Sequence, residues 1–186
     1  GKTLFPEKPH KLSKGLTAVN FKNLMGLHFD KKAGTLVDSW HPKTKRGHKV
    51  SLPYASMAMV ALANTHHHLH DAKKLKMGAA KLLKAQAEFL VKHQAEDGSF
   101  PDGYTLDGSE ATPSDGAKTL LAQSAGIRGL MAAYQATKDK RYWKAAEETY
   151  QFMEENLRSD EANVYRARVG ASESTYDGLN FGATIG

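Results

Sequence analysis

The sequence predicts an all-α protein made of antiparallel helical hairpins that repeat about every 65 residues. Helices that are apolar or small on every face alternate with helices that are apolar on one side only. The connections inside the helix pairs, 71–73 and 138–140, are short enough to force antiparallel hairpins. Similar turns recur at Gly34, Gly98 and Asn163, which are 64 and 65 residues apart. These three observations together predict a single helical-repeat domain over the whole chain.

The helices are predicted in alternating inner and outer positions. The segment 53–70 is apolar or small all round and has Pro53 in its first turn, as expected of a buried helix. The segment 74–93 has apolar residues three or four apart with lysines around the remainder, which indicates an outer amphipathic helix. The alternation then repeats, because 117–137 is again apolar nearly all round and 141–157 again carries one apolar stripe.

Each recurring turn has an acid, then Gly or Asn, then a β-branched or hydroxyl residue and a bulky apolar residue. Glycine and asparagine tolerate a left-handed backbone, so the pattern predicts a tight turn that leads into a short strand. This register divides the chain into repeats at 1–33, 34–97, 98–162 and an incomplete 163–186. We expect one outer helix, 16–28, in the first repeat, and the start of a third inner helix, 182–186, in the last.

Composition limits the possible chemistry. The 186 residues include no Cys, so a disulfide, a Cys-ligated metal and a thiol nucleophile are all excluded. No apolar run approaches the roughly 20 residues that a membrane-spanning helix needs. The chain starts at Gly1 without Met, which suggests a processed or tagged N-terminus and, if processed, a periplasmic or secreted protein.

The net charge of +6 conceals two halves of opposite sign. The first 93 residues carry 17 Lys and Arg against 5 Asp and Glu, whereas the remainder carries 9 against 15. A uniformly basic protein would suggest a polyanionic partner, but a bipolar chain also fits self-association or packing against a complementary partner. No nucleic-acid-binding motif accompanies the charge, so we expect no nucleic-acid partner.

Two passages resemble known repeat enzymes. The sequence QAEDGSF at 94–100 looks like the QxxDGSW repeat of the terpene cyclases, with Phe100 in place of Trp. The passage 120–146 resembles the inner helix, turn and outer helix of the sugar-processing α/α toroids. Over 16–186 the chain is thus similar to the α/α toroid superfamily, which includes six-hairpin glycosidases, polysaccharide lyases and sugar epimerases.

The resemblance carries implications for function. In the cyclases the QxxDGSW element is structural, so it implies a brace at Gln94, Asp97, Gly98 and Phe100. The acidic DxDD and DDxxD patterns of terpenoid chemistry are absent from the sequence. The resemblance therefore implies a carbohydrate-active enzyme of the glycoside hydrolase or polysaccharide lyase type.

Length indicates an incomplete ring. Six hairpins of this period would need about 390 residues, and the chain supplies just under three periods. We therefore expect either a part of a longer polypeptide or a chain whose ring is completed by a further chain. Open ends of apolar helix would otherwise be exposed.

Candidate catalytic residues gather in the segment 94–115, which in toroids lies at the mouth of the central funnel. They are carboxylates and one phenol, namely Asp97, Asp102, Tyr104, Asp107 and Glu110. Two such carboxylates can act as general acid and base on a glycosidic bond if they lie close enough. Alternatively, the aspartates form turns beside neighbouring glycines, and Asp115 caps the 117–137 helix.

Candidate substrate-binding residues lie mainly in the segment 38–49. They are an aromatic ring, two imidazoles and two guanidinium groups, namely Trp40, His41, Arg46, His48 and Arg128. This set suits stacking on a sugar and neutralising a uronate, with His41, His48 or Tyr104 as the base of a lyase. Alternatively, 38–49 is a solvated basic loop. Arg128, the one charge well inside the 117–137 helix, must form an ion pair or face the funnel.

A histidine run supplies a possible metal site. His66 and His70 share one helix face at i, i+4 and would hold two positions of a Zn or Cu site. Two ligands do not make a site, and the run also fits an exposed helix end. We expect no required cofactor and at most adventitious Zn or Cu.

Two hypotheses for function follow. In the first, the chain is part of a carbohydrate-active toroid enzyme that acts on a saccharide, possibly an anionic one. In the second, it is a non-catalytic helical-repeat subunit or scaffold that binds a protein partner. Convergence of two acids, or of an acid with His or Tyr, beside Trp40 would favour the enzyme.

Overall fold

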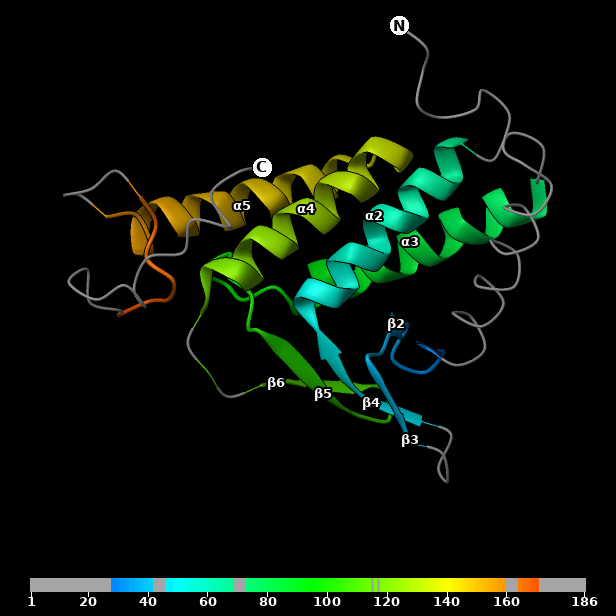
Figure 1. Ribbon diagram of the computed structural model, residues 1–186, viewed down its shortest axis with the longest axis horizontal. Helices are drawn as coiled ribbons and strands as arrows, with labels where there is room; N and C mark the ends of the chain where they lie inside the picture. Colours follow the sequence, from blue (N-terminus) through cyan, green and yellow to red (C-terminus); the bar gives the residue numbers. More distant parts are fainter. Residues whose placement is uncertain are drawn as a thin grey trace, which may run out of the picture.

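The computed structural model describes residues 28–41, 46–68, 73–114, 116, 118–159 and 164–170. Helices dominate this part of the chain (Figure 1). They are α2 (Leu52–His68), α3 (Lys73–His93), α4 (Leu120–Thr137) and α5 (Lys140–Asn156). All four begin and end within a few residues of the expected positions, so the prediction of helical hairpins is confirmed. The helices expected at 16–28 and 182–186 lie outside the described residues, apart from His28.

The helices form two layers. The inner helices α2 and α4 pack side by side, and the outer helices α3 and α5 lie behind them (Figure 1). Fully buried side chains such as Met59, Leu83 and Leu130 fill the space between the layers. Burial of each stabilises the fold by about 1.5–3 kcal/mol. Close contact between α2 and α4 depends on Gly129, because a methyl group there would lie 2.8 Å from the sulfur of Met59.

The second hairpin is capped by side chains at both of its helix starts. The hydroxyl of Thr119 accepts a hydrogen bond from the Ala122 amide at 3.2 Å and is the N-cap of α4. The expectation that Asp115 caps this helix is therefore wrong, because the helix begins at Leu120 rather than at 117. Asp139 caps α5 in the same way, accepting from the Arg141 amide at 3.0 Å.

Two small antiparallel sheets lie at the N-terminal ends of the inner helices. One pairs β1 (Phe29–Asp30) with β2 (Thr35–Leu36). The other has the order β3-β4-β5-β6, with bounds Ser39–His41, Arg46–Ser51, Gly103–Asp107 and Glu110–Pro113. Its central pair, β4 and β5, brings together the segments 38–49 and 94–115, with Val50 opposite Tyr104.

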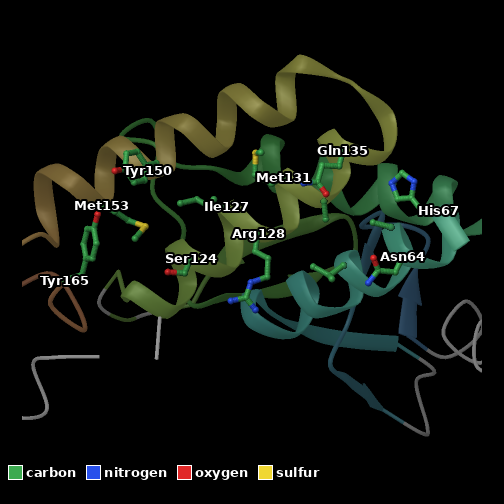
Figure 2. Close-up of a pocket in the computed structure, with 13 residues that line it drawn as sticks. Asn64, His67, Ser124, Ile127, Arg128, Met131, Gln135, Tyr150, Met153 and Tyr165 are labelled. Carbon is green, nitrogen blue, oxygen red and sulfur yellow. The ribbon is translucent and has the colours of Figure 1, made fainter. Parts of the chain in front are cut away.

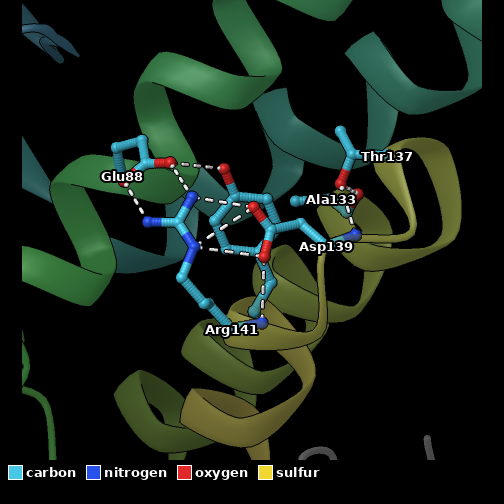
Figure 3. Close-up of polar contacts among 6 residues, drawn as sticks. Glu88, Ala133, Thr137, Asp139 and Arg141 are labelled. Carbon is cyan, nitrogen blue, oxygen red and sulfur yellow. Dashed lines mark hydrogen bonds and ion pairs between the residues drawn. The ribbon is translucent and has the colours of Figure 1, made fainter.

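The outer helices α3 and α5 are joined by a polar network (Figure 3). The guanidinium of Arg141 contacts the Glu88 carboxylate at 2.6 Å and the Asp139 carboxylate at 2.7 Å. The Tyr142 hydroxyl donates to the same Glu88 oxygen at 2.9 Å. The hydrogen bond from Arg141, against a smaller effect of partial burial, lowers the pKa of Glu88. Because Arg141 is exposed and Glu88 is partly exposed, their ion pair contributes little stability.

Among the described helices, none is long and apolar enough to cross a membrane.

Candidate functional site

The main candidate site is a cavity of about 520 Å³ that extends over α4 (Figure 2). Residues from both inner helices, from α5 and from the segment after α5 line it. They are Val60, Ala63, Asn64 and His67 of α2, Ser124, Ile127, Arg128, Met131, Ala132 and Gln135 of α4, Tyr150 and Met153 of α5, and Tyr165. The cavity is therefore built mainly on the helix faces that the outer layer leaves uncovered.

The cavity has two chemically different sides. Figure 2 shows Arg128, Asn64 and His67 on the side of α2, whereas Tyr150 and Met153 lie at the α5 end. We call these the polar side and the apolar side. The polar side can donate and accept hydrogen bonds, and the apolar side offers a surface for an apolar or aromatic group.

Arg128 provides the positive charge of the polar side. It is exposed, and it forms no salt bridge with a described residue. A guanidinium stays charged at all working pH values and can bind a carboxylate through two parallel hydrogen bonds. Of the predicted catalytic or substrate-binding residues whose side chains the structure describes, Arg128 is the one that lines this cavity.

Asp97 and Asp102 lie together at the N-terminal end of α4. The Asp97 carboxylate contacts the ammonium of Lys118 and accepts from the Ser99 hydroxyl at 2.6 Å. The Asp102 carboxylate accepts from the hydroxyl of Thr119, the next residue after Lys118. Partial burial raises the pKa of Asp97, but the hydrogen bonds from Lys118 and Ser99 outweigh it, so the pKa lies below its usual value.

Tyr104 is buried on β5 and is engaged structurally. Its hydroxyl donates to the carbonyl oxygen of His93 at 2.8 Å, and its ring meets Phe89 edge-on at 5.3 Å between centroids. Burial raises the pKa of Tyr104 well above that of a free phenol. Partial burial, with a smaller effect of Lys92, lowers the pKa of His93. This environment makes Tyr104 a poor proton-abstracting base. Its hydrogen bond to His93 instead joins β5 to the C-terminal end of α3.

The remaining predicted residues of the mouth lie on the four-stranded sheet. Asp107 and Glu110 face each other across the exposed β5–β6 turn. In the β3–β4 pair, Trp40 is opposite Gly47 and His41 is opposite Arg46, while His48 is exposed on β4. The sheet therefore joins the two predicted segments, and Asp107, Glu110 and His48 do not line the cavity, while the side chains of Trp40, His41 and Arg46 lie outside the described part of the structure.

The histidine run lies at the end of α2. The ring centroids of His66 and His67 are 5.6 Å apart with an interplanar angle of 66°, and His67 lines the cavity. His70 lies outside the described residues. Within the described part of the chain, no three His, Asp or Glu side chains are grouped so that they would hold a metal ion. A metal at His66 and His70 therefore stays a prediction.

Sequence reasoning missed several cavity residues. Asn64, Ser124 and Gln135 are polar positions on otherwise apolar inner helices. Ser124, Arg128 and Gln135 recur along one face of α4, at helical spacing. This stripe of polar residues could have located the site from the sequence. Polar side chains at helical spacing indicate that one face of the helix is not covered by apolar residues.

Comparison with protein families and with curated proteins gives no match. Solved structures give clear matches. One is an unsaturated glucuronyl hydrolase from Bacillus sp. GL1, responsible for the degradation of glycosaminoglycan: the TM-score is 0.69 at 17% identity over 90% of this chain and 45% of that chain. A sugar epimerase from a ruminal bacterium matches with a TM-score of 0.65 at 14% identity, over 91% and 41%.

A cellobiose 2-epimerase from Bacillus thermoamylovorans gives a TM-score of 0.60 at 17% identity, over 84% of this chain and 39% of that one. The chain has an α/α-toroid fold. It spans less than half the length of these three proteins. At this identity the likeness concerns the fold alone, and it confirms the resemblance on which the prediction of an incomplete ring was based.

Proposed function

We propose that the chain is part of a carbohydrate-active α/α-toroid enzyme and that its cavity binds an anionic saccharide. The observation that carries this proposal is Arg128, a cation without a carboxylate partner among the described residues, on the uncovered face of an inner helix. Saccharide sites combine such a charge with amides and aromatic rings. Here Asn64 and Gln135 supply the amides, and Tyr150 supplies a half-exposed ring.

The catalytic part of the proposal rests on Asp97 and Asp102, two described residues that do not line the cavity itself. Both carboxylates lie at the N-terminal end of α4, next to Lys118 and Thr119. Asp97, held ionised by Lys118, fits the role of base or nucleophile, and Asp102 is the second carboxylate of the proposed pair. Carboxyl groups about 5 Å apart would retain the anomeric configuration, whereas about 6.5 to 9.5 Å would invert it.

Binding of charged and neutral sugars tests the role of Arg128. We expect a uronate-containing oligosaccharide to bind the chain more tightly than its neutral counterpart, as measured by calorimetry or by ligand-observed NMR. Replacing Arg128 with Gln removes a charge-assisted contact of about 1.5–3 kcal/mol, so affinity for the uronate should fall at least about tenfold.

The control variant is Lys144→Gln, which removes an exposed cation of α5 outside the cavity. Affinity for the uronate should be the same in this variant as in the unmodified chain. Equal losses in both variants would mean that long-range charge, and not a site at Arg128, attracts the saccharide. The proposal would also be overturned if neutral and anionic sugars bound equally well.

A protein-binding function is the second candidate, and one observation favours it. Tyr54 and Met57 on α2 are 65% and 62% exposed, which is unusual for large apolar residues of an inner helix. A protein partner that packs on this face of α2 would bury both side chains.

A further inference from the structure

The cavity and the aspartate pair lie at different levels of α4. Arg128 lines the cavity, whereas Asp102 accepts a hydrogen bond from the hydroxyl of Thr119, the N-cap of the helix. Arg128 follows Thr119 by nine residues, so at a rise of about 1.5 Å per residue the two levels are about 13 Å apart along the helix axis. A single sugar ring bound at Arg128 is shorter than this separation and does not reach the carboxylates.

One exposed face of α4 connects the two levels. Leu121, Arg128 and Gln135 are seven residues apart, so they share a face of the helix, and all three are exposed. Leu121 lies between the level of Thr119 and that of Arg128, and it is 52% exposed. A saccharide along this face would meet an aliphatic side chain between the two levels, which suits the C–H face of a sugar ring.

A second guanidinium group lies at the level of the aspartates. The segment 164–170, orange in Figure 1, follows α5 and pairs with the start of α4, where Arg168 lies opposite Thr119 in an antiparallel bridge. The two backbone hydrogen bonds of this bridge, at 2.8 and 3.2 Å, join the neighbouring residues and flank the pair. Arg168 and Thr119 are thus a non-hydrogen-bonded pair, the kind in which the two side chains lie closest on one face.

Arg168 therefore lies beside the hydroxyl group that holds Asp102. In such a pair the Cβ atoms are about 4.5–5.5 Å apart. The side chain of Arg168 is exposed, and it forms no salt bridge with a described residue. Lys118, the neighbouring cation, is by contrast paired with Asp97. An anionic group next to the two aspartates can therefore bind Arg168.

We propose, on the basis of the proposed function, that the saccharide is an oligouronate that lies along the exposed face of α4, with one carboxylate on Arg128 and a second on Arg168. A chain of uronates carries a carboxylate on every unit, so one molecule can bind both guanidinium groups, each through two parallel hydrogen bonds. The unit at Asp97 and Asp102 is then a different unit from the one at Arg128. The bond on which the aspartates act lies within a longer chain, away from the unit that Arg128 binds.

A series of ligand lengths tests this arrangement. Galacturonic acid and its oligomers of increasing length are titrated into the 186-residue chain by calorimetry. We expect the affinity to rise at the length that first spans both guanidinium groups. Arg168→Gln should remove this rise, which lowers the affinity for a long oligomer at least about tenfold and leaves that for galacturonic acid unchanged. Arg168→Lys keeps the charge and should retain part of the rise.

Two further variants separate the possible outcomes. Arg128→Gln should weaken binding at every length, whereas Lys144→Gln, which removes an exposed cation of α5 outside the cavity, should change none of the affinities. The two-cation arrangement is wrong if Arg168→Gln weakens galacturonic acid as much as the long oligomer, if it weakens neither, or if Lys144→Gln has the same effect. The proposed function fails in a different way, namely if Arg128→Gln leaves the affinity for galacturonic acid unchanged.

Discussion

The turns at 30–36 and 94–100 share a left-handed glycine but differ in their backbone hydrogen bonds and in their surroundings: the Gly34 amide donates to the Asp30 carbonyl oxygen, whereas the Gly98 amide donates to that of Ala95. Each has a glycine in the left-handed region, with φ of 72° at Gly34 and 81° at Gly98. Each has an aspartate that accepts hydrogen bonds from the backbone just ahead of it, Asp30 from Lys32 and Ala33, and Asp97 from Ser99. The local sequence is sufficient to explain these shared features.

The two turns differ in how the rest of the protein holds them. In the first, Gln86 of α3 accepts from the Leu36 amide at 2.7 Å. In the second, Gln123 of α4 accepts from the Phe100 amide at 2.7 Å and donates to the Phe100 carbonyl oxygen at 2.8 Å. Gln94 also donates to the carbonyl oxygens of Gly98 and Ala145.

Hydrogen bonds thereby join the second turn to both helices of the hairpin that follows it, whereas among the described residues the side-chain hydrogen bonds from helices to the first turn come from α3. A recurring motif thus gives a left-handed glycine twice, while the contribution of each copy to stability depends on side chains far away in sequence. Substitutions at equivalent positions of the two turns should therefore have unequal effects.

The largest difference is expected between the two glycines. A methyl group at Gly98 would lie 2.5 Å from the carbonyl oxygen of Glu148, whereas nothing lies within 4 Å of one at Gly34. Both substitutions to Ala incur the left-handed penalty of about 1–2 kcal/mol. Gly98→Ala must also displace the backbone of α5, so we expect a total loss of about 3–5 kcal/mol in urea unfolding.

Gly34→Ala is the matched control for the conformational penalty. It should lower the free energy of unfolding by about 1–2 kcal/mol and leave the slope of the urea transition unchanged. Equal losses at the two positions would show that close contact with α5 does not distinguish the turns.

The glutamines should give the second largest difference. Gln123→Leu leaves both the amide and the carbonyl of Phe100 buried without a partner, which we expect to cost about 2–4 kcal/mol. Gln86→Leu removes the acceptor of the Leu36 amide and of the Thr35 hydroxyl, which can still donate to the Leu36 carbonyl oxygen, but it also removes a buried side-chain amide nitrogen that has no partner among the described residues. We therefore expect its cost to be about 1–2 kcal/mol.

Thermal unfolding monitored by circular dichroism compares the two variants on one scale. The lower melting temperature should belong to Gln123→Leu. The reverse order would mean that the first turn is the better anchored of the two, against the hydrogen bonds described above.

The features that sequence could predict are those encoded locally. The pattern of small and apolar residues gave the inner helices, and the spacing of Gly34 and Gly98 gave the turns, because neighbouring residues decide both. Helix α4 ends at Lys138, its C-cap residue, which has a left-handed backbone with φ of 61°. The prediction of a toroid came from the resemblance of 94–100 and 120–146 to known families, and not from a physical argument about the residues.

The features that sequence missed depend on pairing between distant segments. The strand RGHKVS, Arg46–Ser51, has too little alternation to predict a sheet, and it forms one because β5 lies beside it. The glutamines that hold the turns lie 23 and 50 residues away from the amides they bind. The cavity likewise brings together Asn64 of α2 and Arg128 of α4, and nothing in the sequence around either residue indicates that the two line one cavity.

The smallest expected difference concerns Asp97, which has an ammonium partner in Lys118. Because its pKa is lowered in the folded state, its contribution is present above the unfolded pKa and is lost as pH falls through the folded pKa. Both side chains are well exposed, so we expect a coupling energy below about 1 kcal/mol from the double-mutant cycle of Asp97→Asn and Lys118→Met.

The cycle is needed because Lys118 also lies over the ring of Phe152, at 5.1 Å from its centroid, so Lys118→Met alone removes more than the ion pair. Measured by urea unfolding from about pH 6 down to about pH 2, the coupling should fade at the acid end as Asp97 becomes protonated. A coupling that persists at the lowest pH would mean that packing, and not charge, joins the two side chains. The second turn would then be held entirely by its uncharged hydrogen bonds and its contact with α5.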